Sequence, residues 1–363
     1  MKYLFSTLIF IHGAIHLLGF VKAFNLANIP QLSAPVSKAT GLIWLMVFVL
    51  FIVSGIAYLT KHQWWSIVAF VAIILSTFLT ILVWKDAKFA SIPNIIILVV
   101  AGLSLSQVVF NKKVSNEIAQ IFEQNAGLQA TEVTTERLAV LPSPVAKWLQ
   151  VSGVVGKEEI HSVWLKQKAR IKMKPGQENW IEAIAEQYFT IENPAFVWKV
   201  SMNMPPFIKI AGRDMFVDGK GEMLIKMFSL VNIVNEKGMK MDEGTLQRYL
   251  GEIVWFPTAA LSPHITWEEI DALSAKATMD YKGTKGSGTF HFNENGDFIR
   301  YSALRYKGNE PNAKRYEWTI DVNEHAIMNG VKIPVEMTAT WKLDEGDWTW
   351  LEFQIKEIKY NFN

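Results

Sequence analysis

The sequence predicts an α+β protein in which a four-helix transmembrane bundle precedes a curved antiparallel β-sheet, a half-barrel with covering helices. Four long apolar runs fill the first third of the chain, and the composition turns polar after Asn111. From residue 160 onward, apolar residues alternate along segments separated by turn signals. Runs of about 20 apolar residues can cross a bilayer, and alternation is typical of half-buried strands. We expect a transmembrane domain at 1–111, a juxtamembrane helical linker at 112–157 and an antiparallel β domain at 158–363.

The composition limits the chemistry that the chain can perform. It has no cysteine, which excludes disulfides and thiolate ligands. Lysine and arginine number 36 against 34 acidic residues, and no basic tract is interleaved with aromatics, so we expect no nucleic-acid partner. The histidines after the apolar third show no metal-ligand spacing. The sequence therefore predicts no metal site, and it identifies no cofactor.

The four apolar runs, 3–24, 42–59, 64–83 and 92–110, are the predicted membrane spans, so the lipid bilayer is the first expected partner. Four spans place both ends of the chain on one side. The lysines divide evenly, with Lys2, Lys61, Lys112 and Lys113 on one side and Lys22, Lys38, Lys85 and Lys88 on the other. The amino terminus and the adjacent lysine pair favour an inside location. We expect a multi-pass protein of the cell membrane whose C-terminal domain is cytoplasmic.

Polar residues in the bundle form a first candidate site. His12 and His16 lie one turn apart on the first span, and ionisable groups at that depth are costly, which makes them functional candidates. Lys22, Asp86 and Lys88 are expected together at the membrane surface opposite the β domain. A structural role fits the same residues, because imidazoles bridge helices and lysines extend to the interface. Haem ligation would need one histidine from each of two helices or two protomers.

The polar part begins with helices at 114–127 and 145–151, the second started by Ser143-Pro144. Alternation and turn residues then predict strands at 160–173, 180–191, 195–202, 214–218, 222–231, 275–281, 287–292, 298–306, 315–322, 331–343 and 348–360. Consecutive hairpins of this kind indicate one antiparallel meander. Because strands so long and numerous must twist, we expect strong curvature and one concave apolar face.

A helix at 243–255 interrupts the strands, with Asp242 as its expected N-cap. Its apolar residues repeat at helical spacing, so one face of the helix must pack against another part of the protein. The mouth or concave face of the sheet is the expected place. Trp255 stands at the hinge where the helix ends. Arg248 and Glu252 fall one turn apart on its other face.

A second candidate site is a set of polar and aromatic residues that a concave sheet could bring together around the head group of an amphiphile. Its members are Arg213, Asp218, Arg248, Glu252, Trp255, Arg305 and Tyr306. Ordinary ion pairs at strand ends would use the same charges.

Six segments carry a resemblance to a known family: HGAIHLLGFVKAF from His12, WKDAKFASIPN from Trp84, LPSPVAKWLQVSGVVG from Leu141, GRDMFVDGKGEMLIK from Gly212, RYLGEIVWFPTAAL from Arg248 and IKEIKYNF from Ile355. On these segments the chain resembles, over nearly its whole length, an uncharacterised bacterial membrane-protein family with a domain of unknown function after four membrane helices. The resemblance implies an arrangement of parts and no chemistry. The membrane part is similar in outline to DoxX-like proteins. The β domain is similar to lipoprotein-localisation-factor half-barrels, which bind acyl chains.

The function that the sequence favours is a membrane-anchored protein that binds a lipid-like or amphiphilic small molecule in a curved β-sheet cavity. A first alternative is a small membrane redox or proton-handling enzyme that uses His12, His16 and Asp86. A second is a structural or sensory interaction protein whose bundle forms a homo-oligomer. Binding is favoured over catalysis, because no catalytic motif stands out.

Overall fold

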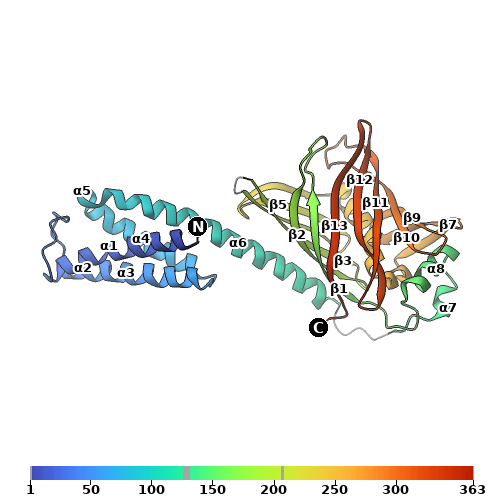
Figure 1. Cartoon of the computed structure of the whole chain (residues 1–363), viewed down its shortest axis with the longest axis horizontal. Helices are drawn as coiled ribbons and strands as arrows, with labels where there is room; N and C mark the ends of the chain where they lie inside the picture. Colours follow the sequence, from blue (N-terminus) through green and yellow to red (C-terminus); the bar gives the residue numbers. More distant parts are fainter. Residues whose placement is uncertain (1, 126–130, 206–207, 363) are drawn as a thin grey trace. The chain divides into compact units, whose positions relative to one another are not determined.

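The computed structural model describes residues 2–125, 131–205 and 208–362. The chain divides into two compact units, Met1–Lys112 and Lys113–Asn363. Apolar helices make up the first unit, and a curved antiparallel sheet with short helices makes up the second (Figure 1). The predicted α+β fold class is confirmed. The three-part division proposed from the sequence stays a prediction.

The first unit is built from helices, the last of which continues into the second unit. They are α1 (Lys2–Ile15), α2 (Leu17–Ala23), α3 (Lys38–Leu59), α4 (Trp65–Leu82), α5 (Trp84–Ala87), the short 3-10 turn η1 (Lys88–Ala90) and α6 (Ser91–Glu123). By length and composition, four helical stretches could cross a membrane: Lys2–Ala23, Lys38–Leu59, Trp65–Leu82 and Trp84–Glu123. Small residues let these helices approach one another, since a Cβ at Gly19 would lie 2.1 Å from the Trp44 ring. The first unit is therefore a closely packed apolar bundle.

Helix α6 differs from the prediction. The sequence placed separate helices at 92–110 and 114–127, whereas α6 runs without interruption through this region to Glu123. The polar residues after Phe110 end the apolar run but include neither glycine nor proline, so nothing there breaks the helix. A change of composition thus marks a change of surroundings and not a helix end. Residues 126 and 127 of the predicted second helix lie outside the described residues.

The second unit begins with two short helices, α7 (Thr135–Leu138) and α8 (Ser143–Ser152), and continues as one antiparallel sheet. The strands are β1 (Ser162–Ile171), β2 (Ile181–Thr190), β3 (Ala195–Met204), β4 (Ile208–Val217), β5 (Lys220–Met227), β6 (Val231–Lys237), β7 (Ile265–Asp271), β8 (Ser274–Tyr281), β9 (Thr284–Phe292), β10 (Phe298–Tyr306), β11 (Arg315–Met328), β12 (Val331–Leu343) and β13 (Gly346–Tyr360).

The order of the strands is β6-β5-β4-β3-β2-β1-β13-β12-β11-β10-β9-β8-β7, and β13 lies beside β1 in Figure 1. The prediction of one continuous meander is therefore wrong. The chain starts in the middle of the sheet, runs outward from β1 to β6, and crosses to the other edge. It then returns from β7 to β13, which pairs with β1. Two meanders joined at their centre form the half-barrel.

The edge strands β6 and β7 were not predicted. The segments VNIVNEK and ITWEEID are mostly exposed, and their polar and charged residues obscure the alternation that marks a strand. Charged residues on edge strands prevent pairing with other chains, which explains the pattern. The sequence signal was weak because an edge strand buries little.

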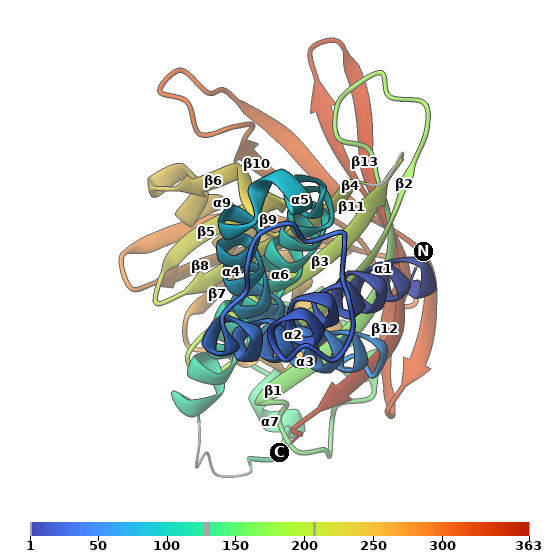
Figure 2. The ribbon, with the colours of Figure 1, turned by 90° about the vertical axis from the view of Figure 1, so that its left-hand side faces the viewer.

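The crossing from β6 to β7 is made by α9 (Met239–Glu252) and the 3-10 turns η2 (Ile253–Trp255) and η3 (Pro257–Leu261). Helix α9 packs against strands of both meanders, chiefly β9 and β5 (Figure 2). It covers the concave face, as expected. Its approach to β5 is so close that a Cβ at Gly221 would lie 2.2 Å from Thr245 Oγ1. The two meanders are thus connected through one helix.

The N-cap prediction for α9 is wrong, because the helix starts four residues earlier with Gly238 at the cap position. Asp242 lies within the first turn. Its Oδ1 accepts a hydrogen bond of 2.8 Å from the Gly221 N–H, and its Oδ2 lies 3.0 Å from Lys220 Nζ. The carboxylate therefore fastens α9 to the start of β5, and a short-range capping rule could not detect that contact.

The two meanders also meet at the tips of their hairpins. Asp218, in the β4–β5 turn, forms an ion pair with Lys282 in the β8–β9 turn. Beside it, the Thr284 hydroxyl donates a 2.6 Å hydrogen bond to the Gly219 carbonyl. The two meanders are therefore in contact at these hairpin tips as well as through α9.

Candidate ligand-binding cavity

A cavity of about 300 Å³ lies between α9 and the concave face of the sheet. Strands β3–β5 provide one wall, and β10–β13 provide the other. The first wall is mostly aliphatic apart from Trp198 and Asp214, which contact Arg248, and the second carries tryptophans and cations. The residues that define the two walls are Val200, Met202, Met223 and Ile225 on the first, and Arg305, Lys307, Trp318, Trp341 and Trp348 on the second. The cavity therefore has one mostly apolar side and one amphipathic side.

Strand register produces the indole wall. Trp318 on β11 lies opposite Trp341 on β12, and Trp341 lies opposite Trp348 on β13. Directly opposed residues point to the same face of a sheet, so the three indoles form a row across neighbouring strands. Trp350 follows Trp348 by two positions and joins the lining. Tryptophan suits such a wall because it combines a large apolar ring with one N–H donor.

Arg248 is the centre of a buried ion cluster at α9. Its Nη1 lies 2.5 Å from Asp214 Oδ2, and its Nε lies 2.9 Å from Glu252 Oε1. The guanidinium also lies 4.8 Å from the centre of the Trp198 ring. On the other side, Gln187 donates a 2.7 Å hydrogen bond to Glu252 Oε2. Two carboxylates and one arginine are thus held together at a site from which water is largely excluded.

Burial sets the protonation behaviour of this cluster. Burial raises the pKa of the Asp214 and Glu252 carboxyls, and the attraction of Arg248 opposes that shift. Burial also disfavours the charged form of Arg248, but the two carboxylates outweigh it and raise the pKa of the guanidinium. Arg248 is therefore the group that makes two buried carboxylates tolerable.

Besides Lys172, two further cations line the cavity without a carboxylate of their own, and both lie over indoles. Arg305 lies over Trp318, with its guanidinium carbon 4.2 Å from the ring centre, and Lys307 lies 4.6 Å from the centre of the Trp348 ring. In the part of the chain that the structure describes, neither forms an ion pair with a carboxylate. Burial lowers the pKa of Arg305 to about 10, so it remains a cation at neutral pH. Burial lowers the pKa of Lys307 as well.

Several buried polar atoms of the cavity residues have no hydrogen-bond partner among the described residues. They are the indole Nε1 atoms of Trp318, Trp348 and Trp350, together with Arg305 Nε and Asp214 Oδ1. Buried polar groups are nearly always hydrogen-bonded, because leaving one unpaired costs about 1–3 kcal/mol. Four unpaired donors and one unpaired acceptor around one cavity indicate a binding site for a polar group that would form hydrogen bonds with them.

The structure brings together only some of the predicted ligand-binding residues. Arg248, Glu252 and Arg305 all line the cavity. Arg213 contributes to the lining, but its guanidinium is held on the opposite face of β4 by Glu222 at 2.7 Å and by Glu117 of α6 at 3.0 Å. Successive strand residues point to opposite faces, so Asp214 occupies the place expected for Arg213.

The remaining three predicted residues lie apart from the cavity lining. Asp218 is in the exposed β4–β5 turn. Trp255 is fully buried in the core, and its indole donates a 3.2 Å hydrogen bond to the Pro334 carbonyl. Tyr306 lies under Arg315, whose guanidinium carbon is 4.1 Å from the ring centre. Each has a structural partner, and their role in ligand binding stays a prediction.

Sequence reasoning did not select Asp214, Lys307 or the indoles as site residues. The predicted strand 214–218 began six residues too late, so the alternation that separates Arg213 from Asp214 could not be used. The available signal was the spacing of Trp348 and Trp350, which places two indoles on one face of a strand.

A family model matches residues 131–353, more than half of the chain. The chain belongs to DUF6544, a family of unknown function. Membership of an uncharacterised family, as the sequence predicted, is thereby confirmed. The cavity lies within the DUF6544 region, since its lining runs from Ile171 to Phe353. The outline similarity of the membrane part to DoxX-like proteins stays a prediction.

Among solved structures, a LolA superfamily protein from Nitrosomonas europaea is similar to this chain. The two are 10% identical with a TM-score of 0.33, and the match covers 64% of this chain and 95% of that chain. None of the curated proteins matches the chain.

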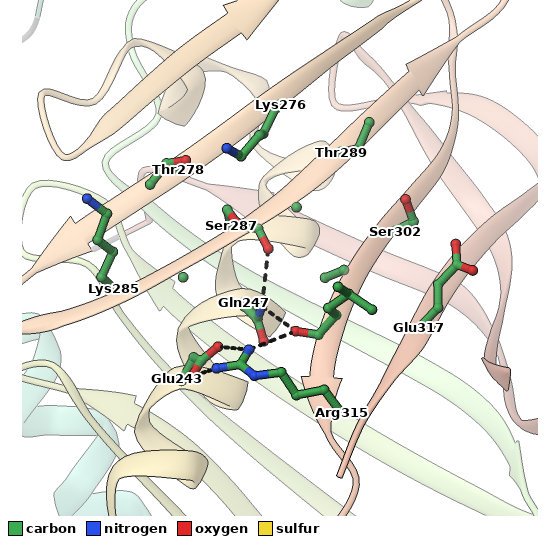
Figure 3. A pocket seen from close by; sticks show the side chains of 14 residues that line it. Glu243, Gln247, Lys276, Thr278, Lys285, Ser287, Thr289, Ser302, Arg315 and Glu317 are labelled. Carbon is green, nitrogen blue, oxygen red and sulfur yellow. Dashed lines mark hydrogen bonds and ion pairs between the residues drawn. The ribbon is translucent and has the colours of Figure 1, made fainter. Parts of the chain in front are cut away.

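The DUF6544 region has a second hollow, of about 680 Å³, where β9 and β10 separate (Figure 3). The strands pair only as far as Ser302, and beyond it the Gln247 amide donates 3.1 Å hydrogen bonds to the Ser287 and Leu304 carbonyls. Arg315 and Glu243 form an ion pair at the rim. This hollow is larger, but it is lined largely by partly or fully exposed polar side chains from the face opposite the core, where water can solvate charges such as Lys285 and Glu317. The cavity under α9 is therefore the better candidate site.

His12 and His16 belong to a hydrogen-bonded network inside the first unit. His12 Nε2 lies 2.8 Å from Asn94 Oδ1, and His16 Nε2 lies 2.9 Å from Ser76 Oγ. Asn94 Nδ2 donates to Ser76 Oγ at 3.0 Å, which joins the two pairs. Polar residues that link helices in this way stabilise bundles in lipid. These hydrogen bonds link the helices of the bundle, which is the structural role considered for the two histidines. An enzymatic site in the bundle stays a prediction.

Lys22, Asp86 and Lys88 do not join this network. The Asp86 carboxylate accepts hydrogen bonds from the Ser33 N–H at 2.6 Å and from its hydroxyl at 2.9 Å. Lys22 donates to the Leu32 carbonyl, and Lys88 lies 5.3 Å from the centre of the Phe89 ring. Lys22 and Asp86 thus hold the loop between α2 and α3.

Proposed function

We propose that this protein is a multi-pass membrane protein whose β domain binds a lipid-like or amphiphilic small molecule in the cavity under α9. The observation that carries the proposal is the division of the cavity into a mostly aliphatic wall and a wall of indoles and cations. A molecule with an apolar chain and a polar head matches both walls at once. Four helices of the same chain are long and apolar enough to span a bilayer, and a bilayer is a source of such molecules.

The size and lining of the cavity support the same ligand class. Ligand pockets measure about 300–1,000 Å³ and are mostly apolar with a few placed polar groups. At about 300 Å³ the cavity is at the lower end of this range, so it fits one short chain or part of a longer one. Methionines such as Met202 and Met223 adapt to chains of differing shape.

A displacement experiment tests the proposal. The full chain, in nanodiscs of phosphatidylcholine, is titrated with a fluorescent fatty acid, and empty nanodiscs provide the background. We expect saturable binding to the protein and displacement by decanoate and decanol, because either chain fits the aliphatic wall. Absence of both saturable binding and displacement, in a protein that also copurifies with no hydrophobic ligand, would contradict the proposal.

A further inference from the structure

The cavity residues impose a requirement on the head group of the ligand, and this inference rests on the proposed function. Leaving aside Arg213, whose guanidinium lies on the other face, the charged lining consists of the cations Lys172, Arg248, Arg305 and Lys307 and the carboxylates Asp214 and Glu252. Both carboxylates are paired with Arg248. The cavity therefore carries net positive charge, and Arg305 and Lys307, at the end of β10, supply two of the three lining cations that form no ion pair among the described residues.

The hydrogen-bonding atoms point to the same kind of head group. Arg305 Nη2 donates a 2.7 Å hydrogen bond to the Gly244 carbonyl, which fixes the guanidinium, while its Nε has no partner among the described residues. Trp318, which stacks on that guanidinium, and Trp348, which stacks on Lys307, each present an unpartnered indole N–H. Donors exceed acceptors at this wall. A head group that satisfies it must supply several acceptor oxygens.

We infer that the cavity is selective for amphiphiles with an anionic, oxygen-rich head group, which binds between Arg305 and Lys307 and accepts hydrogen bonds from the indoles of Trp318 and Trp348. The apolar chain lies against the aliphatic wall of β3–β5. Carboxylates, sulfates and phosphate esters share this chemistry. A cationic or purely neutral head would leave the arginine and lysine without a counter-charge at half-buried positions.

Three ligands with the same ten-carbon chain separate head-group charge from chain burial: decyl sulfate, decanol and decyltrimethylammonium. Their dissociation constants are measured by displacement on the full chain in phosphatidylcholine nanodiscs. Hydrogen bonds to charged groups contribute more than neutral ones, so decyl sulfate is expected to bind about tenfold more tightly than decanol or better. The cationic ligand is expected to bind most weakly.

Substitutions then locate the head group. Lys307→Met and Arg305→Met are expected to reduce the preference for decyl sulfate over decanol severalfold while leaving decanol binding near its original value. Arg305→Lys keeps the charge and should retain most of the preference. Lys314→Met, at an exposed lysine just before β11, is the matched control and should change nothing. If Arg305→Met fails to fold because it loses the Gly244 contact, Lys307→Met still decides the question.

The outcomes separate this inference from the proposed function. Equal affinities for all three ligands, or tightest binding of the cation, would overturn the head-group inference and leave amphiphile binding intact. No binding of any ligand would overturn both. Selectivity for decyl sulfate that survives Lys307→Met and Arg305→Met would overturn the assigned position.

A second comparison identifies the source of the ligand. Decanoate represents a free fatty acid, and a one-chain lysophosphatidylglycerol represents a membrane phospholipid with an anionic head. Tighter binding of one of them, abolished by Lys307→Met, assigns the cavity to that source. Equal and weak binding of both, at the level of decanol, contradicts the inference.

Discussion

Replacing Arg248 by methionine is expected to destabilise the β domain by about 3–5 kcal/mol, because it leaves two buried carboxylates without their shared cation. Asp214 and Glu252 both lose their ion pair, and Asp214 Oδ1 has no other partner among the described residues. Unfolding of the full chain in detergent is followed by tryptophan fluorescence against urea. Most tryptophans lie in the second unit, so the signal reports on the sheet.

The matched control is Arg170→Met. Arg170 pairs with Glu352 on β13 in an exposed ion pair, and loss of such a pair costs well under 1 kcal/mol. An effect of Arg248→Met no larger than that of the control would show that the buried cluster does not hold α9 in place.

The loss of unfolding free energy caused by Arg248→Met should grow as the pH rises. Burial already raises the pKa of both carboxyls above their unfolded values, and removing the cation raises the pKa further. A raised folded pKa gives stability that is present at low pH and is lost as the pH rises through that value. The variant should therefore be closer to wild type at pH 5 than at pH 8.

Filling the cavity is expected to abolish ligand binding. Ile225→Trp places an indole against the aliphatic wall at a half-buried position on β5, where it competes directly with the chain of a ligand. The affinity for the fluorescent fatty acid should fall at least about tenfold, since each buried methylene contributes about 0.8 kcal/mol. Overpacking costs about 1–3 kcal/mol, so the domain should remain folded.

Ile233→Trp on β6 is the control for this experiment. It makes the same substitution at a residue that is 53% exposed and outside the cavity. A second variant, Ala339→Leu, fills the cavity from β12. If it also abolishes binding, the effect of Ile225→Trp is not a local disturbance of β5. Unchanged binding in both filling variants would place the ligand elsewhere.

Much of the architecture followed from periodicity. The helix expected at 243–255 exists as α9 with η2, because its apolar residues must face the core wherever the helix lies. The alternating strands from β8 to β13 were found for the same reason. The pairing of β1 with β13 joins residues nearly two hundred positions apart, and no local pattern records such a partner.

The site was harder to predict than the fold. Arg248 and Glu252 were identified because both lie on one helix, where spacing determines the face. The sequence does not single out Asp214 and Lys307. They line the same cavity only because strands far apart in the sequence come together in the folded sheet. Residue type alone favours Arg213 over Asp214, but a shift of one residue along a strand exchanges the two faces of the sheet.

The most direct test of the central claim is native mass spectrometry of the intact protein released from a mild detergent, recorded together with its absorption spectrum. The proposal predicts a retained mass of several hundred daltons, without a visible chromophore, that is absent from Ile225→Trp and present in Ile233→Trp. A retained haem, quinone or metal that is lost in His12→Ala and kept in Ile225→Trp would contradict it and assign the function to the membrane bundle.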